Sequence, residues 1–118
     1  MRYMLLIHHD EKAWSNLSET ERQRLLMEYV QFTQQINSGG LYLSAARLHP
    51  TSAATSVRVR NGKLVVTDGP FAETREQLSG YFLIEAKDLD EAIRIAARIP
   101  TARHGTIEIR PVMDVPTT

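Results

Sequence analysis

The first strand-like segment, residues 2–8, carries apolar side chains on both of its faces, and this constrains the fold more than any other feature of the chain. Successive side chains of a strand point to opposite faces of its sheet. A sheet with helices on one side and water on the other alternates apolar with polar residues instead. Both faces of this strand therefore need a cover, and a partner subunit is the simplest cover for the second face. The two rows are Tyr3, Leu5 and Ile7 on one face and Met4, Leu6 and His8 on the other.

Two capping boxes predict where helices begin. Ser18 precedes Glu21 by three residues, and Asp88 precedes Glu91 by three, so each pair can satisfy free backbone donors at a helix start. The first helix ends at a pair of glycines and the second at a proline. The apolar stripes that we expect to be buried are Leu25, Tyr29, Phe32 and Ile36 in the first helix, and Leu89, Ala92, Ile93, Ala96 and Ile99 in the second.

The pair Asn61-Gly62 predicts a tight β-hairpin in the middle of the chain. A type I′ turn needs positive φ at both central residues, and this pair adopts it readily. The alternating segments 56–60 and 63–67 form the two strands of the hairpin. Three more segments are strand-like, namely 41–46, 79–86 and 106–110.

The order of these elements is strand, helix, strand, inserted hairpin, strand, helix, strand. It predicts an α+β fold of the ferredoxin-like split βαβ type, with an antiparallel sheet and two helices on one face. The open sheet face must be hidden, and a homodimer that places two such faces together hides both of them. We expect one domain over residues 1–113 and a flexible C-terminal tail over residues 114–118.

Length and composition are those of one folded domain, and they exclude several classes of function. The chain has 118 residues, of which 42% are hydrophobic and 24% charged, as in ordinary globular domains. Its 14 basic and 14 acidic residues cancel, so we expect it to bind neither nucleic acid nor a membrane surface. Without cysteine, the chain has no disulfide and no thiolate chemistry. The apolar start is too short for a signal peptide or a membrane span, so the cytoplasm is the expected location.

Several segments of the chain together match one known pattern. The strongest match is residues 66–78, which contain Asp68-Gly69-Pro70-Phe71. The other matching parts are residues 2–7, Trp14, and residues 56–63 and 107–112. On these residues the chain resembles the YCII-related, or DGPF-domain, family over nearly its whole length.

The resemblance implies a dimeric α/β barrel, related in fold to muconolactone isomerase and to small cofactor-free monooxygenases, with a cleft between sheet and helices. It implies no cofactor and no single reaction, since fold analogy is weak evidence for chemistry. In the branch that gives the family its name, a helix histidine paired with an aspartate has been proposed as an acid–base site. That pair does not carry over, because residues 18–38 contain no histidine. His8 stands where we expect relatives to have an aromatic residue, and Arg75 where they usually have lysine.

Charged side chains cluster after the second hairpin strand, at Asp68, Glu73, Arg75 and Glu76. A carboxylate beside a cleft serves as a general base when it is desolvated, and Asp68 is the first candidate for that role. The other three are candidates for ligand binding.

The same loop has a structural alternative. Gly69 and Pro70 shape the turn, and Phe71 plugs the core. Trp14 stands alone in the polar segment between the first strand and the first helix. We expect it to be a lid over the core or a pocket, because aromatic residues favour half-buried sites.

Arginines near the hairpin are candidates for anion binding. Arg47 ends the strand before the hairpin, and Arg58 and Arg60 share one hairpin face. A guanidinium suits a carboxylate or phosphate of a small anionic ligand. The alternative is an exposed face whose arginines are solvated or paired with acids.

The adjacent histidines His8 and His9 point to opposite sides of the first strand, so only one of them can face a cleft. His8 is the second candidate for catalysis, because histidine titrates near neutral pH. Neighbours on a strand cannot both ligate one ion without a bend, so no metal site is expected.

Two functions are the main candidates, and a dimeric scaffold whose pocket has no ligand stays open as a third. The first is a homodimeric small-molecule-binding protein or cofactor-free enzyme that moves protons in a cleft, with Asp68 as base and Arg47 or Arg58 orienting an anion. The second follows from the resemblance, because family members with this loop often accompany extracytoplasmic-function sigma factors. In that reading, residues 73–76 contact a sigma factor. The sequence leaves open whether the protein is an enzyme.

Overall fold

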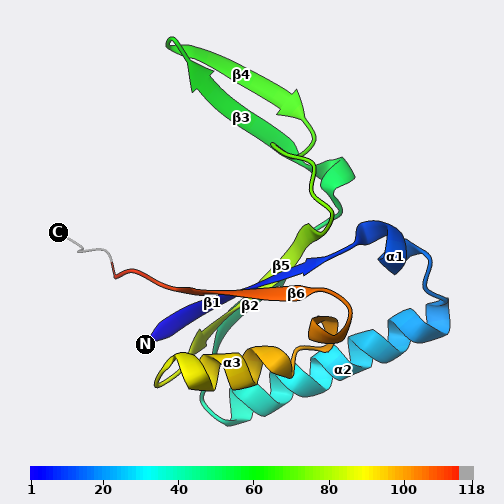
Figure 1. Ribbon diagram of the computed structural model, residues 1–118, viewed down its shortest axis with the longest axis vertical. Helices are drawn as coiled ribbons and strands as arrows, with labels where there is room; N and C mark the ends of the chain where they lie inside the picture. The colour runs from blue at the N-terminus through cyan, green and yellow to red at the C-terminus, as the bar shows by residue number, and fades with distance from the viewer. Residues whose placement is uncertain (115–118) are drawn as a thin grey trace.

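A four-stranded antiparallel sheet forms the body of the protein. The computed structural model describes residues 1–114, and its main sheet has the strand order β2-β5-β1-β6 (Figure 1). The predicted α+β class is confirmed, and the strand order is consistent with the predicted ferredoxin-like arrangement. The strands are β1 (Arg2–His9), β2 (Tyr42–Arg47), β5 (Gln77–Glu85) and β6 (Thr106–Pro111).

Two helices, α2 (Glu19–Ser38) and α3 (Leu89–Ala97), cover one face of this sheet (Figure 1). Both predicted helix starts are confirmed. The Ser18 hydroxyl accepts a hydrogen bond from the backbone N–H of Glu21 at 3.1 Å, and the Asp88 carboxylate accepts one from that of Glu91 at 2.9 Å. None of the helices within residues 1–114 combines the length and the apolar character needed to cross a membrane.

The core lies between these helices and the sheet, and one row of β1 supplies its centre. Leu5 of β1 pairs with Phe82 of β5 on one side and Ile109 of β6 on the other. Phe82 stacks on Tyr29 with 6.4 Å between ring centroids and meets Phe32 edge-on at 5.1 Å. The buried hydrophobic residues are Tyr3, Leu5, Ile7, Phe32, Ile36, Phe82, Ile84, Ala86, Ala92, Ile95, Ala96 and Ile99.

The buried face of α3 differs from the predicted one. Leu89 and Ile93 are about half exposed, at 49% and 47%, whereas Ile95 is buried. Helical spacing explains the difference, because the buried stripe is centred on Ala92 and Ala96. Ile95 lies on the flank of that stripe towards the sheet, and Leu89 and Ile93 lie on the opposite flank.

A short helix, α1 (Glu11–Ser15), forms where the sequence indicated only a polar loop. The Asp10 carboxylate accepts a hydrogen bond from the backbone N–H of Lys12 at 2.9 Å and starts this helix. The Glu11 carboxylate accepts from both the backbone N–H and the hydroxyl of Thr51 at 2.8 Å. A helix of one turn has little stability of its own, so these tertiary contacts hold it. Two 3₁₀ turns complete the fold, η1 (Thr51–Ala53) and η2 (Pro100–Arg103).

The predicted hairpin is confirmed, but it does not join the main sheet. Strands β3 (Thr55–Arg60) and β4 (Lys63–Asp68) form a separate two-stranded sheet, which we call the arm. Its turn has the expected positive φ values, 53° at Asn61 and 74° at Gly62. The arm projects from the body on the side of the main sheet opposite α2 and α3 (Figure 1).

The second face of the main sheet is open in the single chain. It carries the other row of β1, and the neighbouring strand β5 adds Tyr81 and Leu83, which pair with Leu6 and Met4. All four side chains are half-buried, without helices above them. The expectation of two apolar faces on β1 is therefore confirmed for the chain.

The prediction that Phe71 plugs the core is wrong. Its side chain is 80% exposed, in the return segment between β4 and β5. Gly69 does take the expected turn conformation, with φ of 102°. Because the arm stands away from the body, the chain that leaves the turn at Gly69 does not enter the core.

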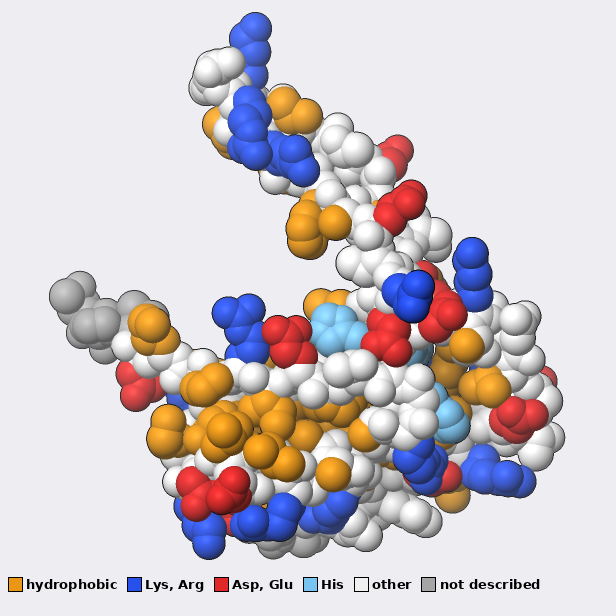
Figure 2. Space-filling view, in the orientation of Figure 1, with side chains coloured by type: hydrophobic (Ala, Val, Ile, Leu, Met, Phe, Trp, Pro, Cys, Tyr) orange, Lys and Arg blue, Asp and Glu red, His pale blue; other side chains and the backbone are white. Residues whose placement is uncertain are grey.

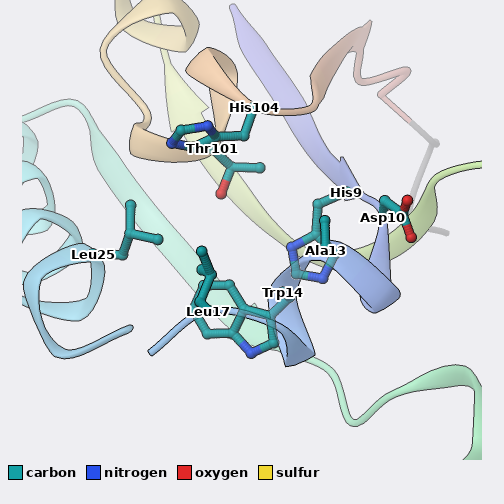
Figure 3. A pocket seen from close by; sticks show the side chains of 8 residues that line it. All are labelled: His9, Asp10, Ala13, Trp14, Leu17, Leu25, Thr101 and His104. Atoms are coloured by element: carbon teal, nitrogen blue, oxygen red, sulfur yellow. The ribbon is translucent and has the colours of Figure 1, made fainter. Parts of the chain in front are cut away.

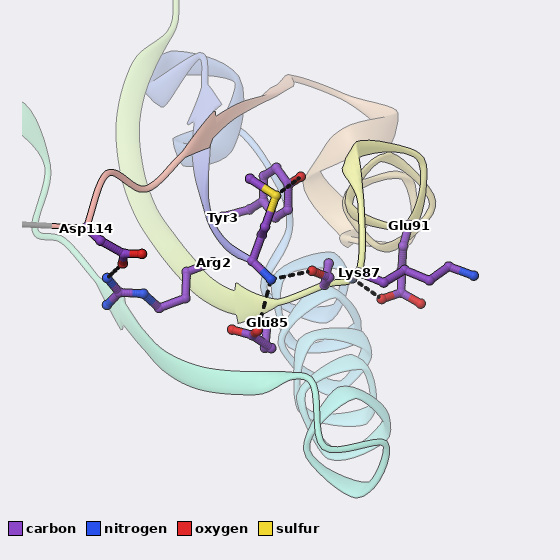
Figure 4. A network of polar contacts seen from close by, with 8 residues as sticks. Arg2, Tyr3, Glu85, Lys87, Glu91 and Asp114 are labelled. Carbon is purple, nitrogen blue, oxygen red and sulfur yellow. Dashed lines mark hydrogen bonds and ion pairs between the residues drawn. The ribbon is translucent and has the colours of Figure 1, made fainter.

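The first residues are tied to the far end of β5 (Figure 4). The amino group of Met1 donates to the Glu85 carboxylate and to the Ala86 carbonyl, both at 2.9 Å. Arg2 donates to the Asp114 carboxylate at 2.7 Å. Apart from Asp114, the predicted flexible tail lies outside the described residues.

Two glycines allow close approaches at the end of the sheet that carries the histidines. A Cβ atom on Gly105 would lie 2.1 Å from the carbonyl oxygen of His8, and one on Gly80 would lie 2.6 Å from that of Ala46. Both obstacles are backbone atoms, so the strands themselves would have to move. The two glycines therefore fix how β6 meets β1 and how β5 meets β2.

We predict that Gly105→Ala lowers the free energy of unfolding by about 1–3 kcal/mol, the usual cost of overpacking a tight contact. Urea denaturation measures this change. Gly39→Ala is the matched control, because its Cβ would lie at an ordinary 3.5 Å from the carbonyl oxygen of Gln35. Equal stability of the two variants would contradict the close approach.

Candidate functional site

A cavity of about 120 Å³ opens where the end of β1 meets α1, the start of α2 and η2 (Figure 3). Two stretches that are far apart in the sequence meet there, residues 9–25 and residues 101–104, because β6, which follows η2, is a neighbour of β1. The cavity is mainly apolar with two histidines at its wall. Its lining residues are His9, Asp10, Ala13, Trp14, Leu17, Leu25, Thr101 and His104.

His9 is the most chemically distinctive side chain of the cavity. It follows Leu5 and Ile7 in the row of β1 that faces the helices, so the strand directs its ring under the α1 segment. Its imidazole stacks on the Trp14 indole, with 5.6 Å between centroids and 22° between planes. Figure 3 shows the two rings side by side at the cavity wall.

The surroundings of His9 favour its neutral form. Burial lowers the pKa of His9 below its usual 6.5, and the positive charge of Arg47 acts in the same direction. The carboxylates of Glu11, Asp10 and Glu76 oppose this shift. At neutral pH the ring is therefore an uncharged proton acceptor, with carboxylates near enough to stabilise the imidazolium once it forms.

A hydrogen-bonded pair of hydroxyl groups includes one residue of the cavity lining. The Tyr29 hydroxyl is hydrogen-bonded to the Thr101 hydroxyl. Burial raises the pKa of the Tyr29 phenol above its usual 10.0, so it stays protonated. Thr101 is buried and also lines the cavity. The Thr101 hydroxyl therefore adds an uncharged polar group to the cavity lining.

The wall that carries Trp14 is held by contacts outside the cavity. The backbone N–H of Glu11 donates to the Gln77 side chain at 2.9 Å, and the Glu11 carboxylate binds Thr51. Glu76 accepts from the Thr106 hydroxyl at 2.8 Å. These bonds tie α1 and the start of β5 to neighbouring segments, which fixes the acidic groups around His9.

The structure brings only two of the predicted site residues close to this cavity. Arg47 and Glu76 are near enough to His9 to act on its charge. His8, on the opposite row of β1, faces the open side of the sheet, where its ring lies 3.2 Å from the Glu108 carboxylate. Its place is therefore outside the cleft between sheet and helices.

The remaining predicted residues lie on the arm and on the segment that follows it. Asp68 ends β4 and is exposed, as is Arg58 in β3. Glu73 and Arg75 are also exposed. Asp68 is not desolvated in the chain, so the condition under which it was a candidate base is not met.

Sequence reasoning placed His8 and His9 on opposite sides of the first strand but chose His8 as the candidate for the cleft. Extending β1 by one residue continues the row of Leu5 and Ile7 and puts His9 on the buried face. Thr101 and His104 gave no signal, because only the packing of η2 brings them to β1. Within residues 1–114, no three histidine or acidic side chains converge as metal ligands would.

We predict that protonation of His9 destabilises the fold. Because its pKa is lower in the folded than in the unfolded chain, the unfolded state binds the proton first as pH falls below 6.5. Stability is then lost progressively until the folded pKa is passed. His9→Asn should lose less stability than the unmutated protein between about pH 7.5 and 5, as measured by urea denaturation.

His49→Asn is the control for this measurement, because His49 is an exposed loop residue. It should keep the pH dependence of the unmutated protein. An unchanged slope in His9→Asn would contradict the account of a desolvated imidazole.

Comparison with known proteins identifies the family. The family model of the YCII-related domain matches residues 1–116. An uncharacterised protein of Rhizobium meliloti (strain 1021) is 38% identical over 114 residues, which cover 95% of this chain and 92% of that protein. The predicted resemblance is confirmed by both matches. The chain belongs to the YCII-related family.

Proposed function

We propose that this YCII-related protein is a homodimer that binds a small molecule in the cavity beside His9 and moves a proton to or from it. The observation that carries the proposal is a neutral, partly desolvated imidazole stacked on Trp14 at the wall of an apolar cavity. His9 replaces Asp68 as the base, and Arg47 keeps its role beside an anionic group of the ligand.

The size and lining of the cavity define the ligand. A cavity of about 150 Å³ accommodates benzene, so about 120 Å³ suits a body no larger than a single small ring. Leu17 and Leu25 favour an apolar body. The carboxylates of Asp10, Glu11 and Glu76 repel an anionic group from the side of His9, whereas Arg47 attracts it. We therefore propose a small apolar molecule with one anionic oxygen group directed to Arg47.

Proton transfer fits the charge arrangement around His9. The neutral ring accepts a proton from a C–H or O–H group of the ligand, and the surrounding carboxylates stabilise the imidazolium that results. The proton then returns to the ligand at the same or a neighbouring atom. A histidine that acts as a base must be neutral before it accepts the proton, and its imidazolium form must be stabilised afterwards. Burial provides the first condition and the acidic neighbours the second.

The homodimer would form through the open face of the main sheet. Met4, Leu6, Tyr81 and Leu83 make that face apolar at its centre. Sheets that pack face to face lie about 10 Å apart and interleave such side chains. Two copies related by a two-fold axis cover each other with the same surface, so no second partner is needed.

Ligand binding can be followed directly, because Trp14 is the one tryptophan of the chain and lies in the cavity wall. We predict that benzoate changes its fluorescence on titration. Arg47→Gln should weaken benzoate binding roughly tenfold, as expected for the loss of one charge-assisted interaction. Benzyl alcohol, which has the same ring without the charge, should bind both proteins equally.

Ala13→Leu fills the cavity and should abolish both titrations, whereas Ala72→Leu, in the exposed segment after the arm, should change neither. Equal responses of the Ala13 and Ala72 variants would contradict the cavity as the binding site. An equal effect of Arg47→Gln on both compounds would contradict only the anionic group.

A second candidate function is a regulatory module that binds an extracytoplasmic-function sigma factor. It is favoured by the exposed segment around Phe71, which is 80% exposed and flanked by the exposed Glu73 and Arg75. A large aromatic side chain with charges beside it is typical of a protein contact. Phe71→Ser and charge reversal at Glu73 and Arg75 should then abolish co-purification with such a factor, and unchanged or absent co-purification would contradict it.

A further inference from the structure

The arm has two chemically different faces. Val57 pairs with Val66, and Val59 with Leu64, so these four side chains share one face. Their exposures run from 56% for Val66 to 69% for Leu64. The opposite face carries Arg58, Arg60 and Lys63 beside Val65. Figure 2 shows hydrophobic and basic side chains next to one another on the arm.

The apolar face has no cover within the described chain. The strands β3 and β4 pair with each other and with no other strand of residues 1–114. An isolated two-stranded hairpin is marginally stable in water, and it gains stability when its apolar face packs on another surface. An alternation this regular, with four aliphatic side chains on one face, indicates a surface that is buried in the working protein.

The position and length of the arm favour a second copy of the chain as the surface that covers its apolar face. The arm rises on the same side of the main sheet as the open face (Figure 1). Its six-residue strands make it roughly 20 Å long. A second copy seated on the open face would place its sheet about 10 Å above, with its helices about 10 Å beyond. The arm is therefore long enough to span both layers of that second copy.

We propose that the arm of each copy lies along the flank of the other copy, with Val57, Val59, Leu64 and Val66 facing inward and the basic row facing solvent. This rests on the homodimer proposed above. Two-fold symmetry makes the exchange reciprocal, so each copy gives one arm and receives one.

The contact area supports this exchange. The open face of a four-stranded sheet of this length has a footprint of roughly 450 Å², which is small for a stable interface. An arm face about 20 Å long and 10 Å wide adds roughly 200 Å² for the arm given and the same for the arm received. The contact then reaches roughly 850 Å² per copy, close to the 800 Å² typical of specific complexes.

The absence of cysteine from the sequence allows a direct test with single cysteines on opposite faces of the arm. Val59→Cys lies on the apolar face, and Arg60→Cys, the next residue, lies on the basic face. In the dimer we expect maleimide to modify Cys at position 59 at least tenfold more slowly than Cys at position 60. When Leu6→Lys is added to separate the copies, the two positions should react at similar rates.

Light scattering on the same samples measures whether each protein is a dimer or a single chain, and this separates the possible results. Equal reaction rates in a confirmed dimer overturn the arm exchange and leave the homodimer intact. Protection of position 59 that persists in the separated chain means that the arm folds onto its own body, which also overturns the exchange. If the unmutated protein is a monomer, the homodimer and the exchange fail together. Leu83→Lys serves in place of Leu6→Lys if the latter does not fold, as judged by circular dichroism.

Discussion

The structure depends on a central strand that is apolar on both faces. β1 has a neighbour on either side, so neither of its edges is free, and the only way to bury both of its rows is to cover both faces of the sheet. The helices α2 and α3 cover the row of Tyr3, Leu5 and Ile7. The other row is open in the single chain, and the proposed homodimer covers it.

The same strand determines the character of the candidate site. His9 extends the core row, so it is partly removed from water and is neutral at pH 7. His8 extends the other row and lies beside Glu108. Adjacent histidines thus have different surroundings, because alternation along the strand sends one to the helices and the other to the open face. The close approach allowed by Gly105 holds η2 and its Thr101 against this strand end.

Local signals in the sequence were sufficient for most of the fold. The capping residues Ser18 and Asp88 and the turn at Asn61-Gly62 act through bonds to near neighbours, so they could be read directly. The short helix α1 could not, because its anchors are Thr51 and Gln77, far along the chain. Nothing local indicated that the hairpin would leave the main sheet.

The candidate site was harder to predict for the same reason. The charges after Gly69 are close in sequence, but apart from Glu76 the structure leaves them exposed on the arm and its return segment. The cavity instead joins residues from β1, α1, α2 and η2, and their proximity arises from packing. In this protein, the charged residues that are close in the sequence do not mark the cavity. The row of β1 that ends at His9, beside α1, does lead to it.

The mass of the protein in solution tests the central claim most directly. If the second row of β1 is covered by another copy, light scattering during gel filtration should give twice the 13.4 kDa of one chain. Leu6→Lys, at the middle of that row, should return the mass to that of a single chain. A folded, stable monomer of the unmutated protein would contradict the account, because the apolar open face would then be tolerated in water.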